Sequence, residues 1–137
     1  MRTAMFQAKY ENLDAIREFV AQAAIDAGLR ETGVYAVQLA ADEACSNIIE
    51  HAYEDQCDEE IECTCSDNGE DLIMIFRDHG KQFDPASVPE PVLTGSLNER
   101  QIGGLGIFLM NHLMDEVHYE SMGEAGNVLT LKKHLTR

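Results

Sequence analysis

The sequence predicts an α+β fold of two layers, in which a mixed, mainly antiparallel sheet is covered on one face by helices. Two observations lead to this expectation. Two segments in the first part of the chain carry apolar residues at helical spacing, and later segments alternate between polar and apolar residues and pair into hairpins. Helices and antiparallel strands in this order favour a two-layer sandwich.

The first part of the chain is predicted to form a short strand followed by two helices. The strand covers Thr3 to Tyr10, and Asn12 is the candidate cap of a helix that ends near Gly28. A second helix begins near Thr32 and ends near Tyr53. Its apolar residues recur at intervals of three and four: Val37, Ala40, Ala41, Ala44, Ile48 and Ala52.

Two hairpins are predicted further along the chain. The first joins a strand at Ile61–Ser66 to one at Leu72–Arg77 through the turn sequence Asp67-Asn68-Gly69. The second joins Glu116–Ser121 to Asn127–His134 around two glycines. Four of the sheet's strands are therefore expected to be antiparallel neighbours in pairs.

An irregular stretch separates the two hairpins. Residues His79 to Gly104 contain all three prolines of the chain and several glycines, and a third helix is predicted to follow at Leu105–Met114. Such a long stretch without regular structure inside a compact domain is usually functional, often as a lid over a site.

Length and charge limit the function. The 137 residues suit one domain, residues 1–137, and carry 10 Lys and Arg against 25 Asp and Glu, a net charge of −15. This charge repels nucleic-acid phosphates and favours basic protein surfaces as partners. The absence of an apolar run long enough for a signal peptide or a membrane span predicts a cytoplasmic protein that does not enter the membrane.

The four cysteines are expected to be reduced thiols in such a compartment. Cys63 and Cys65 are two residues apart on a predicted strand, and with Cys57 and a histidine they invite a zinc interpretation. Because this spacing is not that of the usual zinc knuckle, buried thiols are the favoured interpretation.

The second predicted helix carries the first motif with chemical potential. Glu43 and Asn47 are four residues apart and therefore project from one helical face. A carboxylate and an amide oxygen suit magnesium, and a carboxylate can also accept a proton from an attacking hydroxyl. A solvated helix face also carries such a pair without any function.

Two further motifs lie at the ends of the irregular stretch. Asp78, at the end of a strand, can accept a hydrogen bond from an exocyclic amine, and Gly80 permits the close approach of a flat ring. Gly103-Gly104-Leu105-Gly106 opens a helix, where free N–H groups favour a phosphate. Alternatively, the first is a plain turn and the second a hinge before a core helix.

Taken together, these motifs resemble the GHKL ATPase superfamily, shared by histidine kinases, gyrase B, Hsp90 and MutL, over nearly the whole chain. The Glu43–Asn47 segment resembles its N box, Asp78-His79-Gly80 its first glycine box and Gly103–Gly106 its second. The form of these boxes and the sequence Phe83-Asp84-Pro85 resemble the anti-sigma-factor serine kinases within the superfamily.

The resemblance implies a Bergerat-type fold and a site for ATP and Mg²⁺. It implies that Asn47 ligates Mg²⁺, that Glu43 is the general base toward a protein serine, and that Asp78 binds the adenine amine. The remaining residues of the implied nucleotide site are Gly80, Phe83, Gly103, Gly104, Leu105 and Gly106. Residues from Pro85 to Gly103 would form the ATP lid.

Three positions leave alternatives open. Many members of the superfamily have a threonine after the glycine of the last hairpin, whereas here Asn127 follows Gly126. Either the Asn127 amide takes that role, or Thr130 does if the strand register differs. Arg100 in the lid is a candidate for stabilising charge on the transferred phosphoryl group, or is a solvated loop residue.

The resemblance implies a kinase that binds a sigma factor and phosphorylates a serine of an anti-anti-sigma protein, and that forms a homodimer. The alternative is a non-catalytic ATP-binding module that switches between partners by binding alone. Glu43 discriminates between the two hypotheses, because a module that only binds has no need of a general base.

Overall fold

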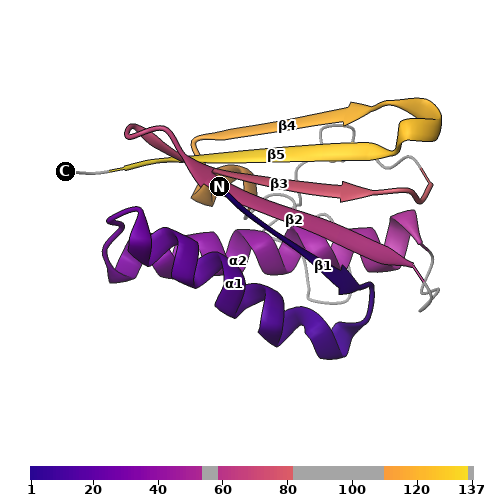
Figure 1. Ribbon diagram of the computed structural model, residues 1–137, viewed down its shortest axis with the longest axis horizontal. Helices are drawn as coiled ribbons and strands as arrows, with labels where there is room; N and C mark the ends of the chain where they lie inside the picture. Colours follow the sequence, from indigo (N-terminus) through magenta and orange to yellow (C-terminus); the bar gives the residue numbers. More distant parts are fainter. Residues whose placement is uncertain (54–58, 82–109, 136–137) are drawn as a thin grey trace, which may run out of the picture.

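The computed structural model describes residues 1–53, 59–81 and 110–135. They form two layers, with helices α1 (Leu13–Asp26) and α2 (Glu31–Asn47) packed on one face of a five-stranded sheet (Figure 1). The strands are β1 (Arg2–Gln7), β2 (Glu60–Asp67), β3 (Asp71–Asp78), β4 (Glu116–Ser121) and β5 (Asn127–His134). The predicted two-layer α+β architecture is confirmed.

The sheet has the order β1-β2-β3-β5-β4, and each of the four neighbouring pairs is antiparallel. The parallel pair that a mixed sheet requires is therefore not found among the described strands. The connections explain this, because β2–β3 and β4–β5 are hairpins, and α1 and α2 run out and back so that β2 returns antiparallel to β1.

The core lies between the sheet and the helices. Alternate strand residues face the helices and are buried, including Ile61, Leu72, Met74, Phe76 and Leu131. Buried residues of α1 and α2 pack against them, among them Ile16, Val20, Val37, Ala40 and Ala41. The intervening strand residues lie on the opposite face of the sheet, which neither α1 nor α2 covers (Figure 1).

The start of α1 differs in detail from the prediction. Asn12 occupies the N-cap position, but its side chain makes no capping hydrogen bond. Its Nδ2 instead donates to the carbonyl oxygen of Gln7 at 2.9 Å. A short 3₁₀ turn at Tyr10–Asn12 brings the amide back toward the end of β1, so Asn12 ties the strand to the helix and does not cap it.

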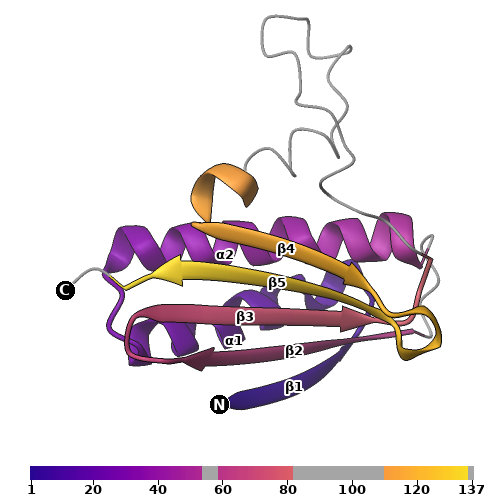
Figure 2. The same cartoon turned by 90° about the horizontal axis from the view of Figure 1, so that it is seen from above.

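The second predicted helix runs without interruption to its expected end, but its last turn is unusual. After Asn47 the chain continues as the π-helical turn η2, Ile48–Ala52. Such wide turns often occur at functional sites. The C-terminal end of α2, the end of β3 and the beginning of β5 lie at the same end of the molecule (Figure 2).

The third predicted helix lies only partly within the described residues. Residues 110–113 are helical, and Met110 and Met114 are buried against the core. The Lys133 Nζ donates to the carbonyl oxygen of Leu113 at 2.8 Å, and the Asp115 backbone N–H donates to the carbonyl oxygen of Lys132 at 2.9 Å. The end of this helix is thereby attached to β5.

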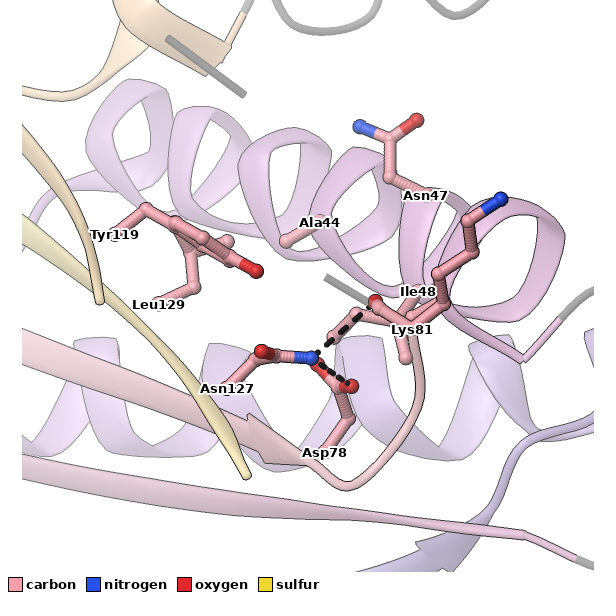
Figure 3. Close-up of a pocket in the computed structure, with 9 residues that line it drawn as sticks. Ala44, Asn47, Ile48, Asp78, Lys81, Tyr119, Asn127 and Leu129 are labelled. Carbon is pink, nitrogen blue, oxygen red and sulfur yellow. Dashed lines mark hydrogen bonds between the residues drawn. The ribbon is translucent and has the colours of Figure 1, made fainter. Parts of the chain in front are cut away.

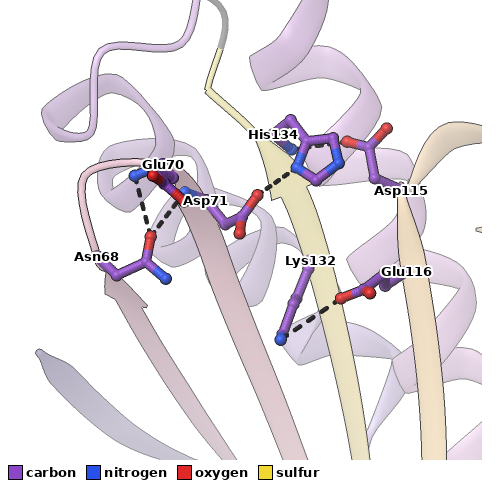
Figure 4. A network of polar contacts seen from close by, with 7 residues as sticks. All are labelled: Asn68, Glu70, Asp71, Asp115, Glu116, Lys132 and His134. Carbon is purple, nitrogen blue, oxygen red and sulfur yellow. Dashed lines mark hydrogen bonds and ion pairs between the residues drawn. The ribbon is translucent and has the colours of Figure 1, made fainter.

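A polar network joins the far end of β5 to its neighbours (Figure 4). The His134 backbone N–H donates to Asp115 Oδ2 at 2.6 Å, and the His134 ring is hydrogen-bonded to Asp71, its partner in the β3–β5 register. The Asp71 side chain raises the pKa of His134 above its ordinary value.

The cysteines in the described part of the chain are buried thiols, as the favoured interpretation expects. Cys45, Cys63 and Cys65 are buried and free, and Cys57 lies outside the described residues. No group of metal-binding side chains occurs in the described part of the chain. Within these same residues, no helix has the length and apolar character needed to span a bilayer.

Candidate functional site

A pocket opens at the end of the sheet where α2, η2, β3, β4 and β5 meet (Figure 3). It is lined by residues from all of these elements: Ala44, Asn47, Ile48, Ala52, Asp78, Lys81, Tyr119, Asn127 and Leu129. Three of the residues that the sequence singled out, Asn47, Asp78 and Asn127, therefore lie around one space.

Asp78 and Asn127 are held together by the sheet. They are the last residue of β3 and the first of β5, and the register places them directly opposite each other. Asn127 Nδ2 donates to Asp78 Oδ1 at 2.9 Å, and the Gly80 backbone N–H donates to the same oxygen at 2.9 Å. Both side chains are almost fully buried, so these hydrogen bonds fix the floor of the pocket.

Two opposing effects act on the pKa of the Asp78 carboxyl group. Burial raises the pKa of the Asp78 carboxyl above its ordinary value, whereas the hydrogen bonds from Asn127 and Gly80 and the neighbouring His79 lower it. The two donors to Oδ1, Asn127 and Gly80, therefore offset part of the effect of burial.

Asn47 contributes a polar group from the helical side of the pocket. Its side chain is 5% exposed, and its Nδ2 has no hydrogen-bond partner within the described structure. The Asn47 amide and the Lys81 side chain point to the same side of the pocket (Figure 3). An unsatisfied buried amide is costly, and such a group is found where a ligand completes its hydrogen bonds.

Glu43 lies one turn before Asn47 on α2 and is half-buried, but it does not line the described pocket. Burial raises the pKa of its carboxyl, and the charges of Asp42 and Glu50 raise it further. Asp42 is itself paired with Arg17 of α1, whose Nη1 lies 2.5 Å from Asp42 Oδ1. Glu43 is therefore a carboxylate whose proton affinity exceeds that of an ordinary glutamate.

Gly80 does not line the described pocket but lies against the protein backbone beside it. A Cβ atom on Gly80 would lie 2.4 Å from the carbonyl oxygen of Ala52 and 2.8 Å from Cδ1 of Tyr53. The adjacent Lys81 backbone N–H donates to the same Ala52 oxygen at 2.6 Å. The glycine is thus required by the contact between the β3 exit and η2, which the expected approach of a flat ring did not anticipate.

The Tyr53 hydroxyl connects the backbone segments around the end of β3. Its hydroxyl accepts a hydrogen bond from the His79 backbone N–H at 2.8 Å and donates to the carbonyl oxygen of Glu60 at 2.7 Å. Burial raises the pKa of the Tyr53 hydroxyl, in keeping with a structural donor that stays protonated. The end of α2, the start of β2 and the exit of β3 are joined through this one side chain.

The structure separates Thr130 from the pocket. Thr130 lies three residues after Asn127 on β5, on the opposite face of the sheet, where it lines a different hollow with Val117, His118 and Lys132. The alternative in which Thr130 contacts the base is therefore wrong, because side chains an odd number of residues apart on a strand point to opposite faces.

The remaining candidate residues lie outside the described residues. These are Phe83, Arg100, Gly103, Gly104, Leu105 and Gly106.

Sequence reasoning missed several residues that line the pocket. Ala44, Ile48 and Ala52 fit the apolar pattern of the second predicted helix, and besides being buried they form the pocket's helical wall. The signal available in the sequence was their spacing of four residues, which places them on the helical stripe next to that of Asn47. Leu129 is two residues from Asn127 on β5, and this spacing was its signal, whereas Tyr119 had none because only the pairing of β4 with β5 brings it here.

Comparison with known proteins gives a consistent result. A family model described as a histidine kinase-like ATPase domain matches residues 6–133. The serine/threonine-protein kinase BtrW of Bordetella bronchiseptica is 33% identical over 100 residues, 73% of this chain and 70% of that protein. The serine-protein kinase RsbW of Halalkalibacterium halodurans is 31% identical over 134 residues, 95% of this chain and 80% of that protein.

Two further similarities are to an anti-sigma factor and to a solved structure. The anti-sigma F factor of Bacillus subtilis is 30% identical over 96 residues, 69% of this chain and 65% of that protein. Among solved structures, the RsbU and RsbW domains of a Mycobacterium tuberculosis protein match with a TM-score of 0.63 at 15% identity. The match covers 100% of this chain and 33% of that one, and it shows a shared fold.

Proposed function

Because the chain belongs to the histidine kinase-like ATPase family, and within it to the anti-sigma-factor serine kinases, we propose that it is an ATP-dependent serine-protein kinase that also binds a sigma factor. Its substrate is a serine of an anti-anti-sigma protein. The observation that carries this proposal is the convergence of Asn47, Asp78 and Asn127, from three separate elements, on one pocket.

The residues of the pocket fit an adenine nucleotide. A buried carboxylate at the floor suits the exocyclic amine of adenine, and the apolar wall of Ala44, Ile48 and Leu129 suits the faces of its ring. Asp78 is therefore the residue that we assign to the adenine amine, and Gly80 shapes the turn beside it.

The donor set also fits magnesium. The amide oxygen of Asn47 is a ligand that Mg²⁺ accepts, and the unpartnered amide nitrogen of the same side chain is a donor that suits a phosphate oxygen. A magnesium ion held there would neutralise charge on the phosphates of the nucleotide. Lys81 lines the same pocket and adds a positive side chain to a chain whose net charge is −15.

Glu43 is the proposed general base. A base works best when its pKa is near the working pH, and burial together with two neighbouring carboxylates raises the pKa of Glu43 toward that range. Its role is to accept the proton of the serine hydroxyl as the phosphoryl group is transferred.

The proposed nucleotide site also includes lid residues that lie outside the described structure. By resemblance, Phe83, Gly103, Gly104, Leu105 and Gly106 contribute to nucleotide binding, the glycine-rich run through backbone N–H groups that hold phosphates. Arg100 is assigned to the charge of the transferred phosphoryl group.

The acidic surface supports the proposed partners. A chain with a net charge of −15 attracts basic protein surfaces and speeds their encounter, which suits a sigma factor as partner. A homodimer is part of the same proposal.

The kinase is tested by mixing the protein with labelled ATP, Mg²⁺ and a candidate anti-anti-sigma protein, and by detecting phosphoserine. We expect Glu43→Gln to reduce transfer by at least about 10²-fold, the scale of general base catalysis, with ATP affinity little changed. Glu62→Gln, a half-buried glutamate on the outer face of β2, is the matched control and keeps full transfer. Unchanged transfer in Glu43→Gln would remove Glu43 from the mechanism.

The same experiment separates the kinase from a module that only binds ATP. Nucleotide binding without any phosphoserine, with partners exchanged on ATP addition, is the result that the binding module requires.

Asp78→Asn tests the adenine contact in the pocket. We expect this variant to bind ATP more weakly, as measured by calorimetry. An unaltered dissociation constant would contradict the adenine assignment.

A further inference from the structure

Strand β1 lies at the edge of the sheet (Figure 1), and its register shows which backbone groups face outward. Among the described strands it pairs only with β2. The Ala8 backbone N–H, just after the strand, donates to the carbonyl oxygen of Glu59 at 2.8 Å. Because backbone groups of an antiparallel strand alternate between its two sides, the even-numbered residues of β1 also bond to β2. The N–H and C=O groups that point away from the sheet belong to Thr3, Met5 and Gln7.

Two of these three residues have both outward groups open. The carbonyl oxygen of Gln7 already accepts hydrogen bonds from Asn12 Nδ2 at 2.9 Å and from the Lys9 backbone N–H at 2.8 Å. Within the described structure, the outward N–H and C=O groups of Thr3 and Met5 have no partner. The Met5 side chain is also 54% exposed. An open strand edge of this kind is a template to which another strand can add.

This edge is uncharged in a strongly acidic chain. Residues 3–8 contain no Asp, Glu, Lys or Arg, whereas the chain as a whole has a net charge of −15. Arg2, just before them, is paired with Asp26 at 2.7 Å. The strand at the opposite end of the sheet, β4, carries Glu116 and Glu120, and charged side chains discourage strand addition. Two copies of the chain repel each other over most of their surface, so the β1 edge is where a second copy can approach.

We propose that the β1 edge is the interaction surface for a second copy of the chain, whose own β1 adds antiparallel across a two-fold axis and joins the two sheets into one. The inference deepens the proposed function, because it states how the homodimer of that proposal forms. A strand that pairs antiparallel with its own copy is self-complementary, as a two-fold interface requires.

The open groups select the register of this pairing. With Ala4 of each copy opposite Ala4 of the other on the axis, Thr3 of one copy exchanges both hydrogen bonds with Met5 of the other. Every open group of the edge is then paired. A register centred on Met5 would instead need the Gln7 carbonyl oxygen, which the Asn12 and Lys9 donors already occupy.

Sedimentation velocity of the full chain over a concentration series tests the surface. We expect the wild-type protein to be a reversible dimer. Met5→Pro removes one outward N–H from each copy and none of the hydrogen bonds to β2, so the fold should be retained, as circular dichroism can check. At about fivefold in affinity for each of the two hydrogen bonds lost, the dissociation constant of the dimer should rise by about 25-fold or more.

Thr130→Lys is the matched control for this experiment. Thr130 lies on the face of the sheet that α1 and α2 leave uncovered, on β5, which is separated from β1 by β2 and β3. A lysine there disturbs the face of the sheet and not its β1 edge, so the dimer should be retained. A dimer that Thr130→Lys dissociates and Met5→Pro leaves intact would overturn the inference, because the face and not the edge would then be the interface.

Disulfide crosslinking tests the register without depending on the proline variant. In the proposed pairing, Thr3 and Met5 of different copies have Cα atoms about 5.5 Å apart, within the range of a disulfide. A mixture of Thr3→Cys and Met5→Cys proteins should therefore form a crosslinked dimer on mild oxidation. Either protein alone should crosslink far less, because its two new cysteines are diagonal neighbours about 7–8 Å apart.

The native cysteines are controlled in the same experiment. Cys45, Cys63 and Cys65 are buried, and Cys57, which lies outside the described residues, is replaced by serine in both proteins. A mixture that crosslinks no more than either protein alone would overturn the proposed register and the inference with it.

The outcomes separate this inference from the proposed kinase. A wild-type protein that stays monomeric at every concentration, yet transfers phosphate to serine, overturns the inference and leaves the kinase intact. A monomer that binds an anti-anti-sigma protein, and loses that binding in Met5→Pro, assigns the edge to a different partner and also overturns the inference. A dimer that responds as expected but binds no ATP overturns the proposed function alone.

Discussion

Replacement of Gly80 by alanine separates two explanations for a glycine at this position. If the glycine is needed only so that a ligand ring can approach, Gly80→Ala folds with wild-type stability and loses nucleotide binding. If it is needed for the contact with η2, stability falls without any ligand. The structure supports the second explanation, because the added Cβ would lie 2.4 Å from the oxygen and 2.6 Å from the carbon of the Ala52 carbonyl.

The size of the effect follows from these contacts. Both atoms belong to backbone, so the exit of β3 must move away from η2, and overpacking of this kind costs about 1–3 kcal/mol. The movement also strains the 2.6 Å hydrogen bond from the Lys81 N–H to Ala52, which contributes roughly 1 kcal/mol. The free energy of unfolding of Gly80→Ala is therefore expected to fall by about 2–4 kcal/mol.

Urea denaturation without nucleotide measures this difference directly. Gly33→Ala is the control, because it lies in the first part of α2 and its added Cβ would meet the flexible end of the Leu29 side chain at 3.1 Å. Alanine in a helix is favoured over glycine by up to about 1 kcal/mol, so this variant should be as stable as the wild type or more so. A Gly80→Ala protein within roughly 0.5 kcal/mol of the wild type would refute the packing argument.

Three further outcomes are expected. If Glu43 is the base, the rate of phosphoryl transfer should rise with pH through a pKa above the ordinary glutamate value. Glu50→Gln removes one repelling charge and should move this rise to lower pH. A pH profile that Glu50→Gln leaves unchanged would argue against Glu43. Because Asp71 raises the pKa of His134, the folded state holds this proton more tightly than the unfolded chain does, so the added stability is complete below the ordinary histidine pKa and is lost as the pH rises through the higher folded pKa. Denaturation series across this range should show the loss in the wild type and a smaller loss in Asp71→Asn, in which Asp115 and Glu116 still raise the pKa of His134. Burial raises the pKa of the Cys45 thiol, so mass spectrometry should find it unlabelled by a thiol reagent in the native protein and labelled after unfolding.

The elements were predictable where a local pattern was strong. The closing hairpin has the predicted bounds, Glu116–Ser121 and Asn127–His134, because alternation is clear in both strands. Gly126 ends the connection between them at a φ of 101°, a conformation that glycine adopts without the strain felt by other residues. By contrast, the change of α2 into η2 was not predictable, because the apolar spacing continues unchanged through Ala52.

The site was predictable only in its polar residues. Asn47 was found through its spacing of four residues from Glu43 on one helical face, and Asp78 through its position at the end of an apolar strand. Tyr53 was not found as a functional contributor, since its role consists of two hydrogen bonds to backbone groups that only the folded chain brings near. Residues that shape a site through contacts with main chain leave little trace in a sequence.

The choice between Asn127 and Thr130 shows where sequence reasoning could have gone further. Leu129 and Leu131 are the apolar residues of this strand that face the helices, and a strand alternates its faces. Asn127 shares their parity and Thr130 does not, so only Asn127 can face the helical layer and the pocket that opens there. What parity cannot supply is the partner, because the pairing of Asp78 with Asn127 depends on the register of β3 against β5. A shift of that register by two residues would keep every side chain on its face and still separate the carboxylate from the amide that orients it.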